Sequence, residues 1–234
     1  MEKTNNSNSR IESFLENPNK ALWTLAIPIM FGMGIHTLYN LIDMIFIGRL
    51  GGSAIAGVAF NMPIFFLMLG LTMGLGSGIT SAIARYIGEK NKEKADNSAD
   101  HALFIAAIIS FFFTIAGVLY GRDILIILGA KGDILSLGYD YLSYIVLGLP
   151  FMVFSGFFRS ILAGEGDMKF PMMIAGLGTV LNIILDPIFI FDLDNYWGLG
   201  LGLGVKGAAL ATVISQLTVF IIFSYMLFIK KHAY

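Results

Sequence analysis

Long apolar stretches alternate with short polar connectors along most of the chain. Six stretches reach the roughly 20 residues that an α-helix needs to cross a bilayer. The connectors concentrate glycine and charge, as residues 88–97 and 164–169 illustrate. The pattern predicts an all-α polytopic membrane protein, a single six-transmembrane-helix bundle over residues 21–229. The predicted spans are residues 21–47, 54–82, 100–121, 138–162, 170–191 and 205–229.

Two polar segments flank the predicted bundle, residues 1–20 and residues 230–234. Lysine and arginine gather on the cytoplasmic side of membrane proteins, so their distribution predicts orientation. With the N-terminus inside, eleven cationic residues fall on the inner side and four on the outer side. We therefore predict a multi-pass protein of the cell (plasma or inner) membrane with both termini cytoplasmic. The outer four are Arg49, Arg122, Lys131 and Lys206.

The composition supports a membrane protein and excludes several other classes. Hydrophobic residues make up 56% of the chain and charged residues 13%, with a mean hydropathy of +0.78. Soluble domains carry about 25% charged residues. A net charge of -1 argues against nucleic acid as a partner, and the absence of cysteine excludes thiol chemistry and disulfides. The lipid bilayer is the partner that this composition predicts.

Two of the predicted spans contain a carboxylate at least four residues from either end of the span. Asp186 lies in span 170–191 with apolar residues on both sides, and Asp43 lies near the end of span 21–47. A charge at the centre of a bilayer costs about 2.5 to 3.5 kcal/mol on insertion scales. Such residues face a bundle interior or an aqueous cavity and belong to ion or proton pathways. Asp43 also admits a simpler interpretation, an interfacial position near Arg49.

The predicted directions of the spans place three polar residues at a common depth. Asp43 lies about 6 Å, and Asp186 about 7.5 Å, below the outer end of its span at 1.5 Å per residue. Thr212 lies about 10 Å from the same face on the returning span. Asn182 shares a helix face with Asp186 at i, i+4 spacing. We predict that the two carboxyl groups lie within about 10 Å of each other and face an internal cavity between three helices.

A carboxylate beside an amide and a hydroxyl suits two kinds of ion chemistry. Oxygen ligands hold Na⁺, and a carboxyl group in apolar surroundings can instead stay protonated because desolvation disfavours its charged form. The candidate coupling residues, with H⁺ or Na⁺ as the ion and no cofactor, are Asp43, Asn182, Asp186 and Thr212. Structural roles are the alternatives: Asn182 can hold helices together, and the Thr212 hydroxyl can bond back to its own helix.

Other residues of the first two spans have candidate roles. Tyr39 and Asn40 present polar groups within one turn of Asp43 and are candidate cavity-lining residues. Pro28 lies in the inner half of the same span, where it is either a static kink or a bending point for the helix that carries Asp43. Glycine recurs every four residues in the second span, a pattern that predicts close helix packing. These glycines are Gly70, Gly74 and Gly78.

Four segments of the chain together resemble the multidrug and toxic compound extrusion (MATE) family. They are LAIPI (residues 25–29), NLIDMIFIGRLG (40–51), LNIILDPIFI (181–190) and GAALATVISQ (207–216). The resemblance implies a secondary antiporter that exports small organic, often cationic, compounds or drugs in exchange for H⁺ or Na⁺. In that family a site in the N-terminal lobe uses residues that fall on Asp43, Asn182, Asp186 and Thr212. Tyr39 resembles the family's nearby tyrosine, and a bend proposed for some members falls at Pro28.

The family is built from two six-helix lobes, and this sequence resembles the first. A fragment and a natural half-size protein are both consistent with it, so the expected partner is the missing C-terminal lobe or a second copy of the chain. One competing function is a flippase for lipid-linked precursors of the same wider superfamily, which would need a cationic cavity, whereas Arg85 and Arg159 lie near span ends. Another is a non-transporting half-size membrane module. No hydrolase motif appears, so no enzymatic activity is predicted.

Overall fold

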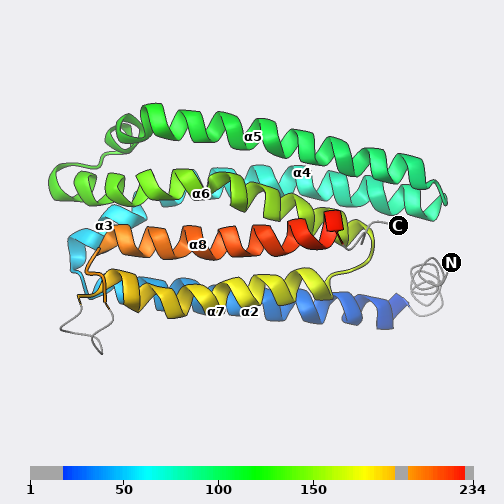
Figure 1. Cartoon of the computed structure of the whole chain (residues 1–234), viewed down its shortest axis with the longest axis horizontal. Helices are drawn as coiled ribbons and strands as arrows, with labels where there is room; N and C mark the ends of the chain where they lie inside the picture. The colour runs from blue at the N-terminus through cyan, green and yellow to red at the C-terminus, as the bar shows by residue number, and fades with distance from the viewer. Residues whose placement is uncertain (1–17, 193–199, 230–234) are drawn as a thin grey trace.

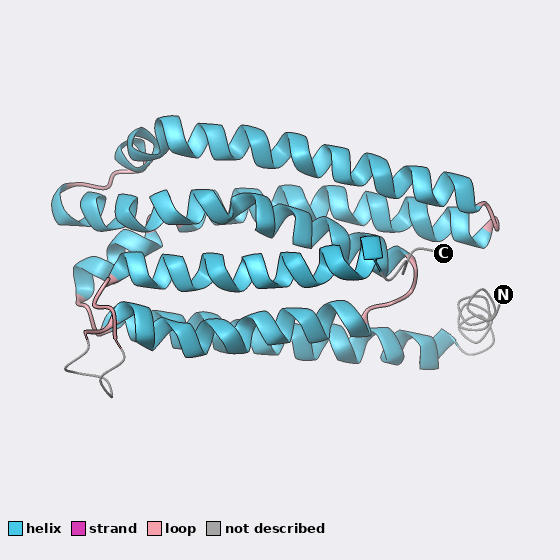
Figure 2. Cartoon of the chain, in the orientation of Figure 1, coloured by secondary structure: helices cyan, strands magenta, loops and turns pink. Residues whose placement is uncertain are grey.

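The computed structural model describes residues 18–192 and 200–229. Most of those residues are helical, and their only β-type contact is an isolated bridge between Asp192 and Leu201 (Figure 2). The long helices run side by side along one axis (Figure 1). They are α2 (Pro18–Gly48), α3 (Gly52–Ala59), α4 (Met62–Gly88), α5 (Lys92–Ile127), α6 (Gly132–Gly164), α7 (Lys169–Ile190), α8 (Val205–Ser224) and the π-helix η2 (Tyr225–Ile229).

The bundle has the dimensions of a membrane-spanning unit. Five helical segments in the described ranges are long and apolar enough to cross a membrane, with α3 and α4 together counted as one. α2 is a further long helix of 31 residues, about 46 Å at 1.5 Å per residue. The start of α2 and the end of η2 lie at the same end of the bundle, beside the α4–α5 and α6–α7 connections (Figure 1). The prediction of an all-α multi-pass membrane protein is confirmed.

The helix α6 forms the centre of the bundle. It packs against α5, α8, α4 and α3, while α7 packs between α8 and α2. Its large aromatic side chains explain the position, because Phe157 and Phe158 are fully buried and Phe158 meets rings from α8. Phe158 stacks on Phe220 with ring centroids 6.0 Å apart and lies 6.1 Å from the ring of Phe223. Helices at the edge of the bundle instead expose large apolar side chains, as a membrane environment allows.

The predicted second span, residues 54–82, lies within the candidate span Gly52–Gly88, which the structure divides into the helices α3 and α4. Asn61 N bonds to Val58 O, so the carbonyl of Gly57 loses the donor that a continuing helix would supply. The Asn61 side-chain amide replaces it, donating to Gly57 O at 3.0 Å and to Gly138 O at 3.2 Å. Pro63, at the start of α4, fits a helix N-terminus because it has no backbone N–H.

The prediction of close packing is wrong for Gly70, Gly74 and Gly78 within this chain, whereas Gly76 of the same helix does pack closely, because a Cβ there would clash with Ser160 Oγ of α6. A Cβ added at Gly70, Gly74 or Gly78 would meet no atom within 4 Å. A second close approach lies in α3: a Cβ at Gly57 would be 2.8 Å from Gly138 N, a backbone atom of α6. Four-residue spacing identified a continuous glycine face, but it did not identify which face of α4 meets another helix.

The connection from α6 to α7 holds a partly buried carboxyl group. Glu165 follows the last residue of α6, and burial raises its pKa from an ordinary value of 4.5 to about 8. The negative charges of Asp167 and Asp96 act in the same direction. Asp167 itself caps α7, since its Oδ1 accepts a hydrogen bond from Phe170 N at 3.1 Å. Folding therefore favours the protonated form of Glu165.

This shift predicts a specific pH dependence of stability. A carboxyl group whose pKa is higher in the folded protein contributes its full stability below pH 4.5 and loses it as the pH rises to about 8. Glu165→Gln should therefore raise the melting temperature above that of the natural protein at pH 9 and leave it unchanged at pH 4. Circular dichroism melts in detergent measure both. Asp123→Asn, at an exposed position of α5, is the control and should melt like the natural protein at both pH values. Equal melting of Glu165→Gln and the natural protein at pH 9 would refute the assignment.

Candidate functional site

Three helices bring the predicted polar residues together at one end of the bundle. α2 packs along α7, and α7 packs along α8. α2 and α7 run in the same direction (Figure 1). Their last turns are joined by Phe46 and Phe191, whose rings meet edge to face with centroids 6.0 Å apart. Asp43 lies three residues before Phe46 and Asp186 five before Phe191, so the two carboxylates differ in height by only about 3 Å.

The two carboxyl groups belong to one electrostatic site. Asp43 and Asp186 are close enough for their charges to interact across the α2–α7 contact. Both are buried, with exposed fractions of 8% for Asp43 and 0% for Asp186. The low exposed fraction of Asp43 excludes an exposed position for its side chain in this bundle.

Asn182 connects α7 to α8 within this site. It is buried, and its amide admits two orientations that differ by exchange of oxygen and nitrogen. In one, Nδ2 donates to Thr212 Oγ1 at 3.3 Å. In the other, Nδ2 donates to Asp186 Oδ2 at 3.0 Å while Oδ1 accepts from Thr212 N at 3.1 Å. The second orientation gives both amide atoms a partner of the correct kind and ties Asp186 to α8.

One oxygen of each aspartate is left for a ligand. Asp43 Oδ1 and Asp186 Oδ1 are buried and have no hydrogen-bond partner among the residues that the structure describes. Two adjacent buried carboxylates that both carry a negative charge would be unfavourable, because burial removes the hydration of each group and the two charges repel each other. A proton or a cation removes both penalties. The arrangement can therefore hold H⁺ on a carboxyl oxygen or place oxygens around a small cation such as Na⁺.

The local sequence of α7 sets the surroundings of Asp186. Pro187 follows directly within the helix and has no N–H to donate to the preceding turn. The end of the helix is closed by the segment that leads into α8. Four backbone N–H groups of this segment donate to carbonyl groups at the end of α7. The pairs are Leu201 N to Ile188 O, Gly202 N to Phe191 O, Leu203 N to Phe189 O and Gly204 N to Ile190 O. This loop satisfies a helix end that would otherwise need water, and so encloses the site.

The remaining sequence candidates have mixed outcomes. Asn40 is exposed on α2, so it does not line an enclosed cavity within this chain. The side chains of Tyr39 and Pro28 lie outside the described part of the structure, although α2 is continuous past both positions. Thr212 is partly buried, and its hydroxyl donates to Ala208 O at 3.1 Å, the back-bond expected of a structural threonine. It contacts the site as well, through Asn182.

One polar residue near the site was not predicted from the sequence. Ser215 lies one turn beyond Thr212 on α8, is 4% exposed, and has a buried Oγ without a hydrogen-bond partner in the described residues. Its backbone lies beside Gly178 of α7, one turn before Asn182. The i, i+3 spacing from Thr212 is the signal that could have identified it. Ser215 extends the line of polar groups between α7 and α8.

The sequence and the fold of the chain are similar to those of known proteins. The family model MatE matches residues 28–188. The chain is 29% identical over 211 residues to the FAD transporter of Shewanella oneidensis, covering 90% of this chain and 46% of that protein. It is 30% identical over 207 residues to the multidrug export protein MepA of Staphylococcus aureus, covering 87% and 44%, respectively. A crystal structure of MATE in the bent conformation has a TM-score of 0.83 at 40% identity, covering 92% of this chain and 46% of that one.

The chain spans about half the length of these relatives, as expected for one of two lobes. The family match extends over most of the sequence and includes Asp43, Asn182 and Asp186. Helical architecture, membrane-spanning length and the resemblance found in the sequence all agree with it. The chain belongs to the MatE family of multidrug and toxic compound extrusion transporters.

Proposed function

We propose that this chain is the ion-coupling lobe of a secondary antiporter that exports organic compounds in exchange for H⁺ or Na⁺. The observation that carries the proposal is the pair of buried carboxylates, each with an oxygen that lacks a partner in the described residues. Asn182 holds one of them in place from α7. Binding of the coupling ion neutralises the pair, and its release restores the repulsion between Asp43 and Asp186. The ion thereby biases the relative positions of α2 and α7.

The exported compound is proposed only as a class. One relative is named as a multidrug export protein and another as an FAD transporter. These names span different chemical types of organic molecule, and the cavity that would select between them needs a second lobe or a second copy of this chain. We propose that both termini are cytoplasmic, because the inner side then holds eleven of the cationic residues.

Bending of α2 at Pro28 is the proposed link between ion binding and shape. Proline in a helix interior removes one hydrogen bond and weakens the turn before it. Asp43 lies on the same helix, so a change in its contacts with α7 alters the position of the segment beyond the proline. Structures of similar proteins are described as the bent and the straight conformations of a MATE, so two conformations are known among them.

Thr212→Ala tests which ion is used. If the ion is Na⁺, the Thr212 hydroxyl completes an oxygen shell, and its loss should weaken apparent ion affinity several-fold. If the ion is H⁺, the effect should be small, because the proton resides on a carboxylate. The dependence of efflux on Na⁺ concentration in a two-lobe transporter containing this chain measures the difference. Thr218→Ala is the matched control, since Thr218 Oγ1 donates to Ile214 O at 2.9 Å on the same helix, away from the carboxylates.

A further inference from the structure

An open groove between α4 and α5 lies outside the proposed ion site. Its volume is about 520 Å³, and it is lined by residues of both helices. It lies towards the α4–α5 connection, at the end of the bundle that holds the start of α2 and the end of η2 (Figure 1). By the distribution of cationic residues, this end faces the cytoplasmic leaflet.

The groove changes from polar to apolar along its length. α4 and α5 are antiparallel, so Tyr86 and Lys94 lie at the end near the connection, while Leu75 and Ile105 lie deeper. Eleven residues separate the two levels on each helix, about 16 Å at 1.5 Å per residue. That distance extends from the headgroup region of a leaflet well into its hydrocarbon. The deep end is continuous with exposed apolar side chains, since Phe104 is 66% exposed beside Ile105.

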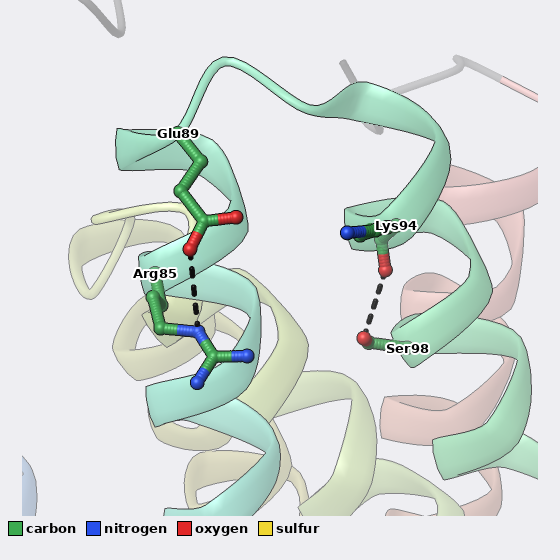
Figure 3. A network of polar contacts seen from close by, with 4 residues as sticks. All are labelled: Arg85, Glu89, Lys94 and Ser98. Atoms are coloured by element: carbon green, nitrogen blue, oxygen red, sulfur yellow. Dashed lines mark hydrogen bonds and ion pairs between the residues drawn. The ribbon is translucent and has the colours of Figure 1, made fainter.

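The polar end of the groove is cationic. Tyr86 is flanked by two positive groups, with Arg85 Cζ 4.8 Å and Lys94 Nζ 5.8 Å from its ring centroid. Arg85 and Lys94 come from facing helices, and Glu89 is already paired with Arg85 at 3.6 Å (Figure 3). His101 also lines the groove, with its Nδ1 held 2.7 Å from Asn97 O. None of the described lining residues is acidic.

Small residues keep the floor of the groove open. Gly78 lines it, and a Cβ at this position would meet no atom within 4 Å. Ala82 and Ala102 line it as well. The glycine face of α4, which makes no close helix contact inside this chain, therefore creates space on the outside of the bundle. That space can accept a chain of methylene groups.

We propose that this groove binds one anionic phospholipid of the cytoplasmic leaflet. The headgroup phosphate lies at Lys94, His101 lies about 10 Å deeper along α5, and Tyr86 takes the interfacial position that tyrosine favours in membranes. One acyl chain follows the floor past Gly78 towards Leu75 and Ile105. The positive charge at the polar end fits an anionic headgroup, and the apolar lining below it fits an acyl chain. A soluble anion would contact only the polar end. The lipid site is independent of the ion site.

Native mass spectrometry of the purified 234-residue chain tests the proposal. Phosphatidylglycerol and phosphatidylcholine with identical acyl chains are titrated separately, and the first bound lipid is quantified. Phosphatidylglycerol should bind about fivefold more tightly or better, as expected for one cation beside an anionic headgroup. Lys94→Gln should remove most of that preference and leave phosphatidylcholine binding unchanged. Gly78→Leu should weaken binding of both lipids, because its side chain fills the floor.

Gly70→Leu is the matched control, since the same substitution on the same helix also enters open space but does not line the groove. It should bind both lipids like the natural chain. Equal affinity for the two lipids in the natural chain would overturn the proposal. So would unchanged lipid binding in a folded Gly78→Leu protein. If Gly78→Leu does not fold, the smaller Gly78→Val variant takes its place, and Lys94→Gln, an exposed substitution, tests the headgroup separately.

Discussion

Asp186→Asn should abolish ion-dependent export by a two-lobe transporter that contains this chain, while the protein still folds and inserts. Asparagine has nearly the same shape as aspartate and can still accept the hydrogen bond that Asn182 Nδ2 donates. It cannot take up and release a proton, and it carries no negative charge to hold Na⁺. Efflux of an organic dye driven by an imposed ion gradient should fall to the background of empty membranes.

Asp123→Asn is the matched control for that experiment. Asp123 lies on α5, is exposed, and is remote in the sequence from the helices that form the ion site. The same change of carboxylate to amide at residue 123 should leave efflux at the level of the natural transporter when the variant and the natural transporter are present in equal amounts. Normal efflux by Asp186→Asn at equal abundance would show that Asp186 has only a structural role.

The chain reconstituted by itself as a monomer should not export against a gradient. Alternating access needs one rigid bundle to move against another, and this chain supplies a single bundle whose apolar side chains on α2 and α4 are exposed. Leu41 of α2 and Phe66 of α4, for example, are 58% and 67% exposed. Ion binding should nevertheless persist, because the residues of the proposed ion site come from α2, α7 and α8 alone.

A liposome efflux assay on material of measured oligomeric state tests this second prediction. We expect the monomer to show only background efflux. Supplying the second lobe should produce efflux against the gradient. Efflux by a parallel dimer would identify the chain as a natural half-size transporter, with a second copy taking the place of the other lobe. Concentrative efflux by a proven monomer would contradict the need for two bundles.

Apolar length and charge position carried most of the information about this fold. Spanning helices leave long uninterrupted apolar runs, and a carboxylate inside such a run is rare enough to identify a site before any contact is known. Counting residues from the predicted span ends placed Asp43, Asp186 and Thr212 at one level, and the contacts of α7 with α2 and α8 agree with that level.

Other features depended on contacts between distant residues and could not be read from spacing. The break before α4 depends on Asn61 reaching Gly138, a residue 77 positions away. The outward direction of the Gly70 face depends on which side of α4 packs on α6. The buried position of Ser215 likewise depends on the approach of Gly178 from α7. Local periodicity identifies a face, but the identity of the neighbour is set by the whole bundle.

Infrared difference spectroscopy of the carboxyl groups in the purified chain tests the central claim, that Asp186 and Asp43 form the site of the coupling ion. Spectra are recorded after a pH step and, separately, after addition of Na⁺, for the natural chain, Asp186→Asn and Asp123→Asn. We expect at least one trigger to produce a carboxyl band in the natural chain and in Asp123→Asn that is absent in Asp186→Asn. Identical difference spectra for all three proteins under both triggers would contradict the account.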